Sequence, residues 1–426
     1  MNNALYTDNK TTQSGSNAHK YTVIAGLSVA HEVPAALGSL MVITYFRDRF
    51  DMPIEMIGLF GLPLLISGLK WVWAPIVDRI GSNRFGRRLS WIVPSAVIVA
   101  LLYVVMGLIQ PSLERIYLIV GLFMVIKIFF SLYEIAADAY VIENLRDEEK
   151  GAGSGAYWFG KEIGQVIGLA VLLYIADVYG WMACFFSAAG LFMVTNLIAL
   201  TRREQPVRPR PENHQAKLWT YVKEPVNRRV LLLVFIFAFA VQIPSAIIGP
   251  FLNDKGFSLA QIGVTVGVAA GIGAALSLAI ASFTIRRVGI KRMAIIVGLF
   301  GLFALPPFLW LTQTDSPTLV VVLAIIFWGS LMTAPIRMTF YAARLQWTGR
   351  DQAGTDLTLQ QCAWFFGYAA TLAFSGFVAG TFGWMAVFIM NGVLVTAVMI
   401  AFILLHDRFC EETSALHEAS SAQSAL

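Results

Sequence analysis

The sequence predicts an all-α membrane protein, and three observations support this fold class. The 426-residue chain is 57% hydrophobic and only 13% charged, which is about half the charged share of a soluble domain. Its apolar residues gather in runs of about 20, the length that crosses a hydrocarbon core of about 30 Å. Such runs must be helices, because open strands leave backbone groups unpaired in lipid.

Twelve apolar runs fit the chain, separated by short stretches rich in glycine, proline and charge. In chain order we expect spans at 21–46, 56–77, 89–109, 116–137, 155–175, 181–200, 230–252, 260–285, 293–312, 318–341, 355–379 and 384–405. These spans form two sets of six, and the polar stretch between the sets holds four prolines and eight Lys or Arg residues.

The spans divide the chain into two bundles with a linker and two tails. We expect a disordered cytoplasmic tail over 1–20, six-helix bundles over 21–200 and 230–405, a linker over 201–229 and a cytoplasmic tail over 406–426. Most Lys and Arg residues lie on one side of this topology, which places both termini and the linker in the cytoplasm.

The two halves repeat short motifs in the same order, at offsets of 203 to 210 residues. Residues 30–37 align with 240–247, Gly-Trp-Met-Ala recurs at 180–183 and 383–386, and Arg-Asp recurs at 146–147 and 350–351. This predicts two pseudo-symmetric bundles. Parallel repeats of six spans are a plan used by transporters, with a site between the repeats.

Other function classes are poorly supported by the sequence. The basic residues lie in short loops rather than in a basic face, which argues against nucleic acid. The three cysteines form no CxxC pair, and no metal-ligand spacing or nucleotide-binding loop is present. We therefore expect no enzyme, no cofactor and no metal site, and a chain that acts as a monomer.

The loop between the second and third expected spans carries a family motif. It reads Asp-Arg-Ile-Gly-Ser-Asn-Arg-Phe-Gly-Arg-Arg over 78–88, and a weaker echo lies at 286–292. The loop resembles the signature loop of the major facilitator superfamily. The resemblance implies the fold of that superfamily and a gating latch formed by Asp78, Arg79, Gly81, Arg87 and Arg88. Positive-inside anchoring is the alternative role for these charges.

Two further segments resemble one branch of that superfamily. Residues 133–140 (YEIAADAY) are similar to a segment of the muropeptide permeases and of the rhizobactin and pyochelin siderophore permeases, and 353–360 (AGTDLTLQ) is similar to a siderophore permease segment. The resemblance implies a proton-coupled importer in the bacterial inner membrane, carrying a siderophore or a similar polar organic solute. A muropeptide or drug transporter is the alternative.

Several ionisable side chains fall inside the expected spans, where each costs at least about 2.5 to 3.5 kcal/mol. Lys127, Glu134 and Asp138 are spaced to share one helical face. Glu32 is the preferred proton carrier because its counterpart in the second half, Gln242, cannot titrate. Its neighbour His31 is expected to tune the site near neutral pH, and a hydrogen-bonded packing residue is the simpler alternative. The proton-coupling candidates are Glu32, His31, Glu134 and Asp138.

The remaining polar and aromatic residues at matching depth are candidates for solute binding. An ion pair of Lys127 with Glu162 or Glu32 is as plausible as a transport role, and Lys161 must point about 100° away from Glu162. Arg337 would suit an anionic solute, or pair with Asp138 as a gate. The solute-binding candidates are Lys127, Lys161, Glu162, Gln242, Arg337, Trp158, Gln360, Gln361 and Trp364.

Overall fold

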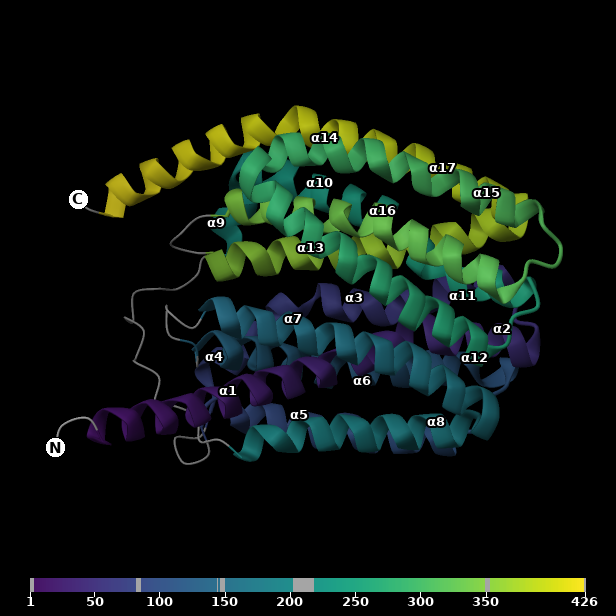
Figure 1. The fold of residues 1–426 in the computed structure, drawn as a ribbon, viewed down its shortest axis with the longest axis horizontal. Coiled ribbons are helices and arrows are strands. Elements are labelled where there is room, and N and C mark those ends of the chain that lie inside the picture. Colours follow the sequence, from purple (N-terminus) through teal and green to yellow (C-terminus); the bar gives the residue numbers. More distant parts are fainter. Residues whose placement is uncertain are drawn as a thin grey trace.

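The computed structural model describes residues 4–81, 86–143, 145, 150–201, 218–348 and 353–424. These residues form an elongated bundle whose helices run close to its long axis, with both chain ends at the same end of the molecule (Figure 1). We call that end the terminal end and the opposite one the far end. The predicted all-α fold class is confirmed.

The helices of the first half form what we call the N-terminal bundle. In chain order they are α1 (Ala4–Ala36), η1 (Leu37–Met41), α2 (Val42–Phe50), η2 (Ile54–Gly61), α3 (Leu62–Gly68), η3 (Lys70–Val72), α4 (Ala74–Arg79), α5 (Leu89–Leu108), η4 (Leu113–Arg115), α6 (Ile116–Glu143), α7 (Lys150–Val166), η6 (Ile167–Val171), α8 (Leu172–Leu197) and η7 (Ile198–Thr201).

A short helix, α9 (Leu218–Lys223), precedes the helices of the C-terminal bundle. These are α10 (Pro225–Val241), α11 (Ile243–Asp254), α12 (Leu259–Gly263), η8 (Val264–Ala269), α13 (Ala270–Val288), α14 (Ile290–Gly301), η9 (Leu302–Ala304), α15 (Leu305–Gln313), α16 (Leu319–Gln346) and α17 (Ala353–Ser424).

Nine helical stretches of the described residues are long and apolar enough to cross a membrane. Two of them, Phe159–Thr201 and Asp356–Leu416, contain a glycine with non-helical backbone angles where the chain reverses, so each crosses twice. The continuous helical path of α1, η1 and α2 runs beside the others and supplies a further crossing (Figure 1).

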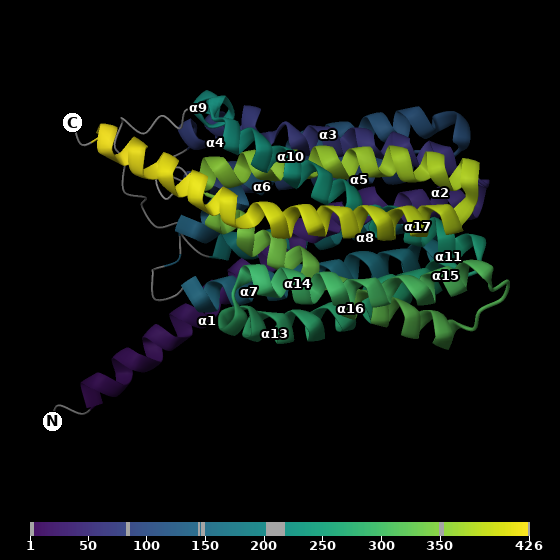
Figure 2. The same cartoon turned by 90° about the horizontal axis from the view of Figure 1, so that it is seen from above.

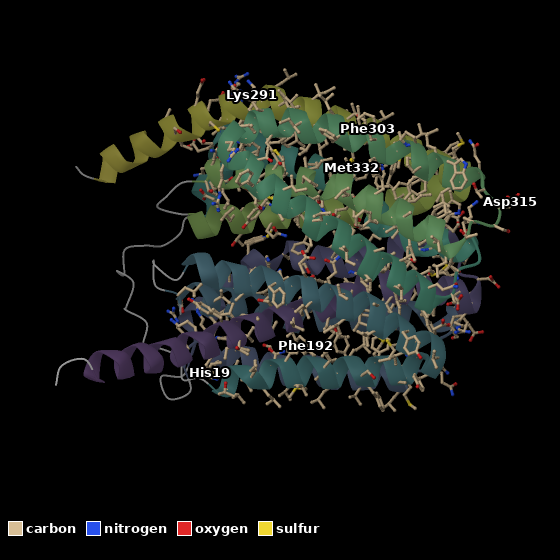
Figure 3. All side chains as sticks on the ribbon, in the orientation of Figure 1. His19, Phe192, Lys291, Phe303, Asp315 and Met332 are labelled. Atoms are coloured by element: carbon tan, nitrogen blue, oxygen red, sulfur yellow. The ribbon has the colours of Figure 1, made fainter. Side chains whose placement is uncertain are left out.

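The outer surface is apolar, as lipid requires. Phe303, on η9, is 60% exposed and points away from the bundle, whereas Phe192, on α8, is fully buried inside it (Figure 3). Asp315 marks the loop at the far end, between α15 and α16 (Figure 3). A bilayer would cover the apolar band between the two polar ends.

The repeated Gly-Trp-Met-Ala motif has the same structure in both bundles. Gly180 and Gly383 reverse the chain at φ of 83° and 80°, a conformation that glycine alone adopts without strain. The following tryptophans pack on matching rings, with centroids 5.9 Å apart for Trp181 and Phe46 and 5.5 Å apart for Trp384 and Phe251. The sequence repeat therefore corresponds to a structural repeat.

Two seams of small residues join the bundles. In the first, η2 and α3 pack on α17, so that a Cβ added at Gly61 would lie 2.8 Å from the carbonyl oxygen of Ala369. In the second, α12 and η8 pack on η6, and a Cβ at Gly263 would lie 2.7 Å from the carbonyl oxygen of Leu169. Such close backbone approach requires small residues.

The bundles merge at the far end and separate toward the terminal end. One hydrophobic core fills the N-terminal bundle and continues into α11, α12 and the far-end parts of α16 and α17. A second core, which includes Phe237, Phe340, Trp347 and Phe402, fills the rest of the C-terminal bundle. The far end is therefore the closed end of this conformation.

Three polar contacts also join the bundles at the far end. Arg47 Nε donates to Asp254 Oδ1 at 2.7 Å, and Asn253 Nδ2 donates to Asp48 Oδ1 at 2.7 Å. The backbone N–H of Ala260 donates to Asp177 Oδ2 at 3.1 Å. We call these contacts the far-end lock.

Both chain ends are helical beyond the apolar runs. Helix α1 begins at Ala4 within the segment expected to be disordered, and α17 continues to Ser424, so both extend past the bundles (Figure 2). The last part of α17 is held by ion pairs of Glu412 with Arg229 and of Asp407 with Lys291. Tertiary charge pairs extend this helix beyond the apolar run.

Candidate functional site

Five ionisable side chains form a continuous row inside the N-terminal bundle. Lys70 Nζ lies 3.2 Å from Glu134 Oε1, and the same oxygen lies 3.1 Å from His31 Nε2. On the other side of the ring, His31 Nδ1 lies 3.1 Å from Glu32 Oε1 and 3.2 Å from Lys161 Nζ, and Lys161 pairs with Glu32 at 3.2 Å. We call this set the ionic row.

Four spans contribute to the ionic row: η3 carries Lys70, α6 carries Glu134, α1 carries His31 and Glu32, and α7 carries Lys161. The row can form because α1 and α7 approach closely. A Cβ added at Gly164 of α7 would lie 3.0 Å from the Cβ of Glu32, so glycine at this position brings Lys161 within reach of the Glu32 carboxylate.

The ionic row accommodates two protonation states of His31. With a neutral ring, Nε2–H donates to Glu134 while Nδ1 accepts from Lys161. With a cationic ring, both nitrogens donate to carboxylates, Nε2 to Glu134 and Nδ1 to Glu32. The other four members carry two positive and two negative charges, so a proton changes the row from neutral to a net charge of +1.

Asp138 lies one turn beyond Glu134 on α6 and is linked to the row through an aromatic ring. Tyr157 of α7 donates its hydroxyl to Asp138 Oδ1 at 3.0 Å, and Lys161 Nζ lies 5.1 Å from the centroid of the same ring. His31 and Asp138 also line one small pocket with Tyr157. Asp138 therefore binds within its own bundle, and the alternative in which it pairs with Arg337 is not seen.

Lys127 does not form the ion pair that was considered for it. Its side chain is buried, and its ammonium lies 5.0 Å from the centroid of the Phe130 ring, which in turn packs 5.5 Å from His31. In the described part of the chain no carboxylate pairs with Lys127; Glu32 pairs with Lys161 instead. Lys127 is a cation held beside the ionic row.

Glu162 of α7 and Arg337 of α16 belong to opposite bundles and lie close enough to interact electrostatically. Each is the strongest opposite charge acting on the other, although no hydrogen bond or ion pair of Arg337 occurs among the described residues. Arg337 is exposed at mid-height on α16. Gln165 of α7 is also exposed, and its side chain falls between those of Lys161 and Glu162. Lys161 and Glu162 point in different directions, as predicted.

The other candidates in the C-terminal bundle are held inside it. Gln360 is fully buried, accepts from Arg344 Nε at 3.0 Å and donates to the Tyr221 hydroxyl at 3.3 Å. Gln361 accepts from the same guanidinium at 3.5 Å, and Trp364 packs beside it, 6.0 Å away. These contacts favour a structural role over solute binding.

Gln242 occupies the break between α10 and α11, and its buried amide oxygen has no hydrogen-bond donor among the described residues. It matches Glu32 in the sequence repeat, but no described cation binds it as Lys161 binds Glu32. The side chain of Trp158 lies outside the described residues.

The candidate gating loop is tied to the end of α6. Arg87 Nη2 lies 2.8 Å from Glu143 Oε1, and Arg88 Nη2 lies 2.7 Å from the same oxygen. Gly86, rather than Gly81, has the positive φ, 95°, and Gly289 in the matching loop has a φ of 81°. The side chains of Asp78 and Arg79 lie outside the described residues, so the latch stays a prediction.

Four residues of this region were not singled out by sequence reasoning. Tyr157, Gln165 and Arg344 are common residue types in unremarkable positions. Lys70 lies near the end of the second expected span, and its side chain is only 9% exposed.

Comparisons with known proteins agree with this architecture. The family model described as Major Facilitator Superfamily matches residues 35–345. The anhydromuropeptide permease of Escherichia coli K12 is 23% identical over 393 residues, which are 89% of this chain and 77% of the permease. An uncharacterized protein of Haemophilus influenzae is 27% identical over 289 residues, which are 66% of this chain and 68% of that protein.

A solved structure shares the fold. The crystal structure of a bacterial homologue of the human lysosomal transporter Spinster, described as inward-facing and unoccupied, superposes with a TM-score of 0.64. The two sequences are 16% identical, and the match covers 96% of this chain and 97% of the other.

Proposed function

The chain belongs to the Major Facilitator Superfamily and is a secondary transporter, and we propose that it carries an anionic solute of the muropeptide class together with protons. The comparisons favour this alternative over the siderophore that was expected first, because the curated relatives named above include a muropeptide permease and no siderophore permease. The single observation that carries the anionic solute is the exposed guanidinium of Arg337, which has no ion-pair partner among the described residues.

Arg337 suits a carboxylate for two reasons. Its planar guanidinium binds carboxylates with two parallel hydrogen bonds, and a muropeptide carries free carboxylates on its peptide. In this conformation Glu162 of the other bundle opposes the charge of Arg337. A carboxylate that enters between the bundles would compete with Glu162 for the guanidinium, so Glu162 would favour release.

The ionic row supports coupling to protons. It lies in the other bundle from Arg337, and it remains satisfied whether His31 carries one proton or two. Charges buried at this depth are functional sites by default. We assign proton binding to His31 with Glu32 and Glu134, and the connection toward solvent to Asp138.

The excess of basic residues at the terminal end supports a cytoplasmic location for that end in the proposed arrangement. The structure, closed at the far end, is then a state that faces the cytoplasm. In a bacterium the chain would lie in the inner membrane, and the solute would be delivered inward by alternation of the two bundles.

Transport into proteoliposomes tests this proposal. We expect the purified chain to accumulate a radiolabelled anhydromuropeptide when the vesicle lumen is alkaline, and to stop accumulating it when a protonophore removes the gradient. A panel of ferric siderophores provides the comparison. Accumulation of a siderophore without any muropeptide would overturn the proposed solute, and accumulation that ignores the protonophore would overturn the proton coupling.

A further inference from the structure

Lys70 contacts both bundles at once. Its Nζ donates to Glu134 Oε1 at 3.2 Å in the N-terminal bundle, and it lies 5.3 Å from the ring centroid of Phe365 on α17 of the C-terminal bundle. The Lys70 side chain is 9% exposed and the Glu134 side chain 7%. In so dry a site a cation over an aromatic face is attracted more strongly than at a wet surface.

Lys70 also stands where the first seam ends. Going from the far end toward the terminal end, Gly58 faces Ala373, Gly61 faces Ala369 and Gly68 faces Phe366, with an added Cβ 2.8 to 3.0 Å from its neighbour. Lys70 over Phe365 is the next contact in this series. Beyond it the C-terminal bundle has its own core.

The ammonium of Lys70 shares its acceptor with His31. Both Lys70 Nζ and His31 Nε2 bind Glu134 Oε1, at 3.2 and 3.1 Å. A proton that makes His31 cationic strengthens the bond of His31 to that oxygen. A proton on Glu134 itself removes the negative charge that holds Lys70. Either event weakens the hold of Glu134 on the ammonium.

We propose that Lys70 is the positioning residue that transmits the protonation state of the ionic row to the contact between the bundles. With the row unprotonated, Glu134 fixes the ammonium against Phe365 and keeps the inner part of the seam together. With a proton in the row, the ammonium is released and the seam can rearrange. The inference rests on the proton coupling proposed above and adds the route by which the proton acts.

The groups that face this pair come from every element packed around it. They are His31 and Glu32 on α1, Lys127 and Asp138 on α6, Lys161 on α7, and Cys362 on α17. None of the others combines a bond to the ionic row with a contact to a ring of the opposite bundle in the described residues. Lys70 is therefore the point at which a pH response of the seam can be interrupted.

The test is a distance measurement that needs no solute. Spin labels are placed at Ile80→Cys and Leu345→Cys, two exposed positions near the terminal ends of α4 and α16, in a chain whose three native cysteines are replaced by alanine. Distances are recorded in liposomes at about pH 6 and about pH 8, on either side of the ordinary histidine value.

In the otherwise native chain we expect two populations of spin-label distance. The ratio of these populations should change by about threefold or more between the two pH values. Lys70→Met should show the same distance distribution at both pH values. Lys70→Arg, which retains the charge, should show the pH response of the native chain. Phe365→Leu should reduce it, and Phe366→Leu, which alters the neighbouring ring at Gly68, should not. Size-exclusion profiles establish that each variant is folded.

Two results would overturn the inference: an unchanged pH response in Lys70→Met, or equal responses in the two phenylalanine variants. A native chain whose distances ignore pH would overturn it as well. A wrong solute would leave all of these distances unaffected, because it is detected only in the transport assay. The two proposals can therefore fail separately.

Discussion

The two bundles share a fold and a sequence repeat, but they treat charge differently. In the N-terminal bundle five ionisable side chains bind one another in a buried row. In the C-terminal bundle Arg337 stands exposed without a partner among the described residues, and Gln242 replaces the carboxylate of Glu32. A repeat can therefore preserve architecture while its halves differ in chemistry, and we propose that one bundle binds the proton and the other the anion.

The largest expected effect separates paired charges from exposed ones. Glu134→Ala leaves Lys70 and His31 buried without their acceptor, and breaking such a buried pair lowers the free energy of unfolding by about 3–5 kcal/mol. Glu162→Ala, which removes a carboxylate that binds no described residue, should change it by about 0.5 kcal/mol or less. Thermal melting in detergent compares the two variants, and equal melting temperatures would remove the distinction between the regions.

The contrast between the bundles was only partly predictable from sequence. Hydropathy and spacing predict the spans, the repeat and the depth of the intramembrane charges, because a lipid environment makes both patterns strong. These charges are His31, Glu32, Glu134 and Arg337. Which acid binds which base depends on packing between spans, so Lys161, rather than Lys127, is the partner of Glu32.

Lys70 was missed for a local reason. The second span contains the 3₁₀ segments η2 and η3, and a 3₁₀ helix has about 3.0 residues per turn instead of about 3.6. An α-helical count over this span therefore misjudges the direction of every later side chain, including that of Lys70.

The next effect concerns two arginines of α16. Arg337→Gln should raise the KM for the anionic solute by about 10- to 100-fold, the value of a hydrogen bond to a charged group of about 1.5–3 kcal/mol, and leave melting unchanged. Arg344→Gln should lower the melting temperature and leave the KM unchanged, because Arg344 binds Gln360 inside the bundle. Initial uptake rates and melting curves measure both, and a parallel loss in the two variants would contradict the assignment of Arg337 to the solute.

A smaller effect is expected at the far-end lock. Arg47→Gln removes a partly exposed ion pair between the bundles, worth about 0.5–1 kcal/mol. The conformation that is open at the far end should become about two- to fivefold more populated. Spin labels on either side of this end report the change, and Arg229→Gln, whose partly exposed pair with Glu412 lies within one bundle and outside the lock, is the control.

The smallest effect is expected where the repeat has lost its charge. The amide oxygen of Gln242 is buried without a donor from the described residues, so Gln242→Leu removes an unsatisfied group and should leave stability nearly unchanged. The matched Glu32→Leu removes the partner of Lys161 and His31 and should be strongly destabilising. Similar melting temperatures for the two variants would mean that the halves do not differ in this respect.

The most direct test of the division of labour is the number of protons carried with each solute molecule. We propose to measure it in proteoliposomes for the native chain and for Glu32→Gln, which keeps the shape of the side chain and removes its charge. We expect proton uptake coupled to solute in the native chain and no proton uptake in the variant, which should retain solute exchange between the two sides of the membrane. Proton uptake in Glu32→Gln equal to that of the native chain would contradict it.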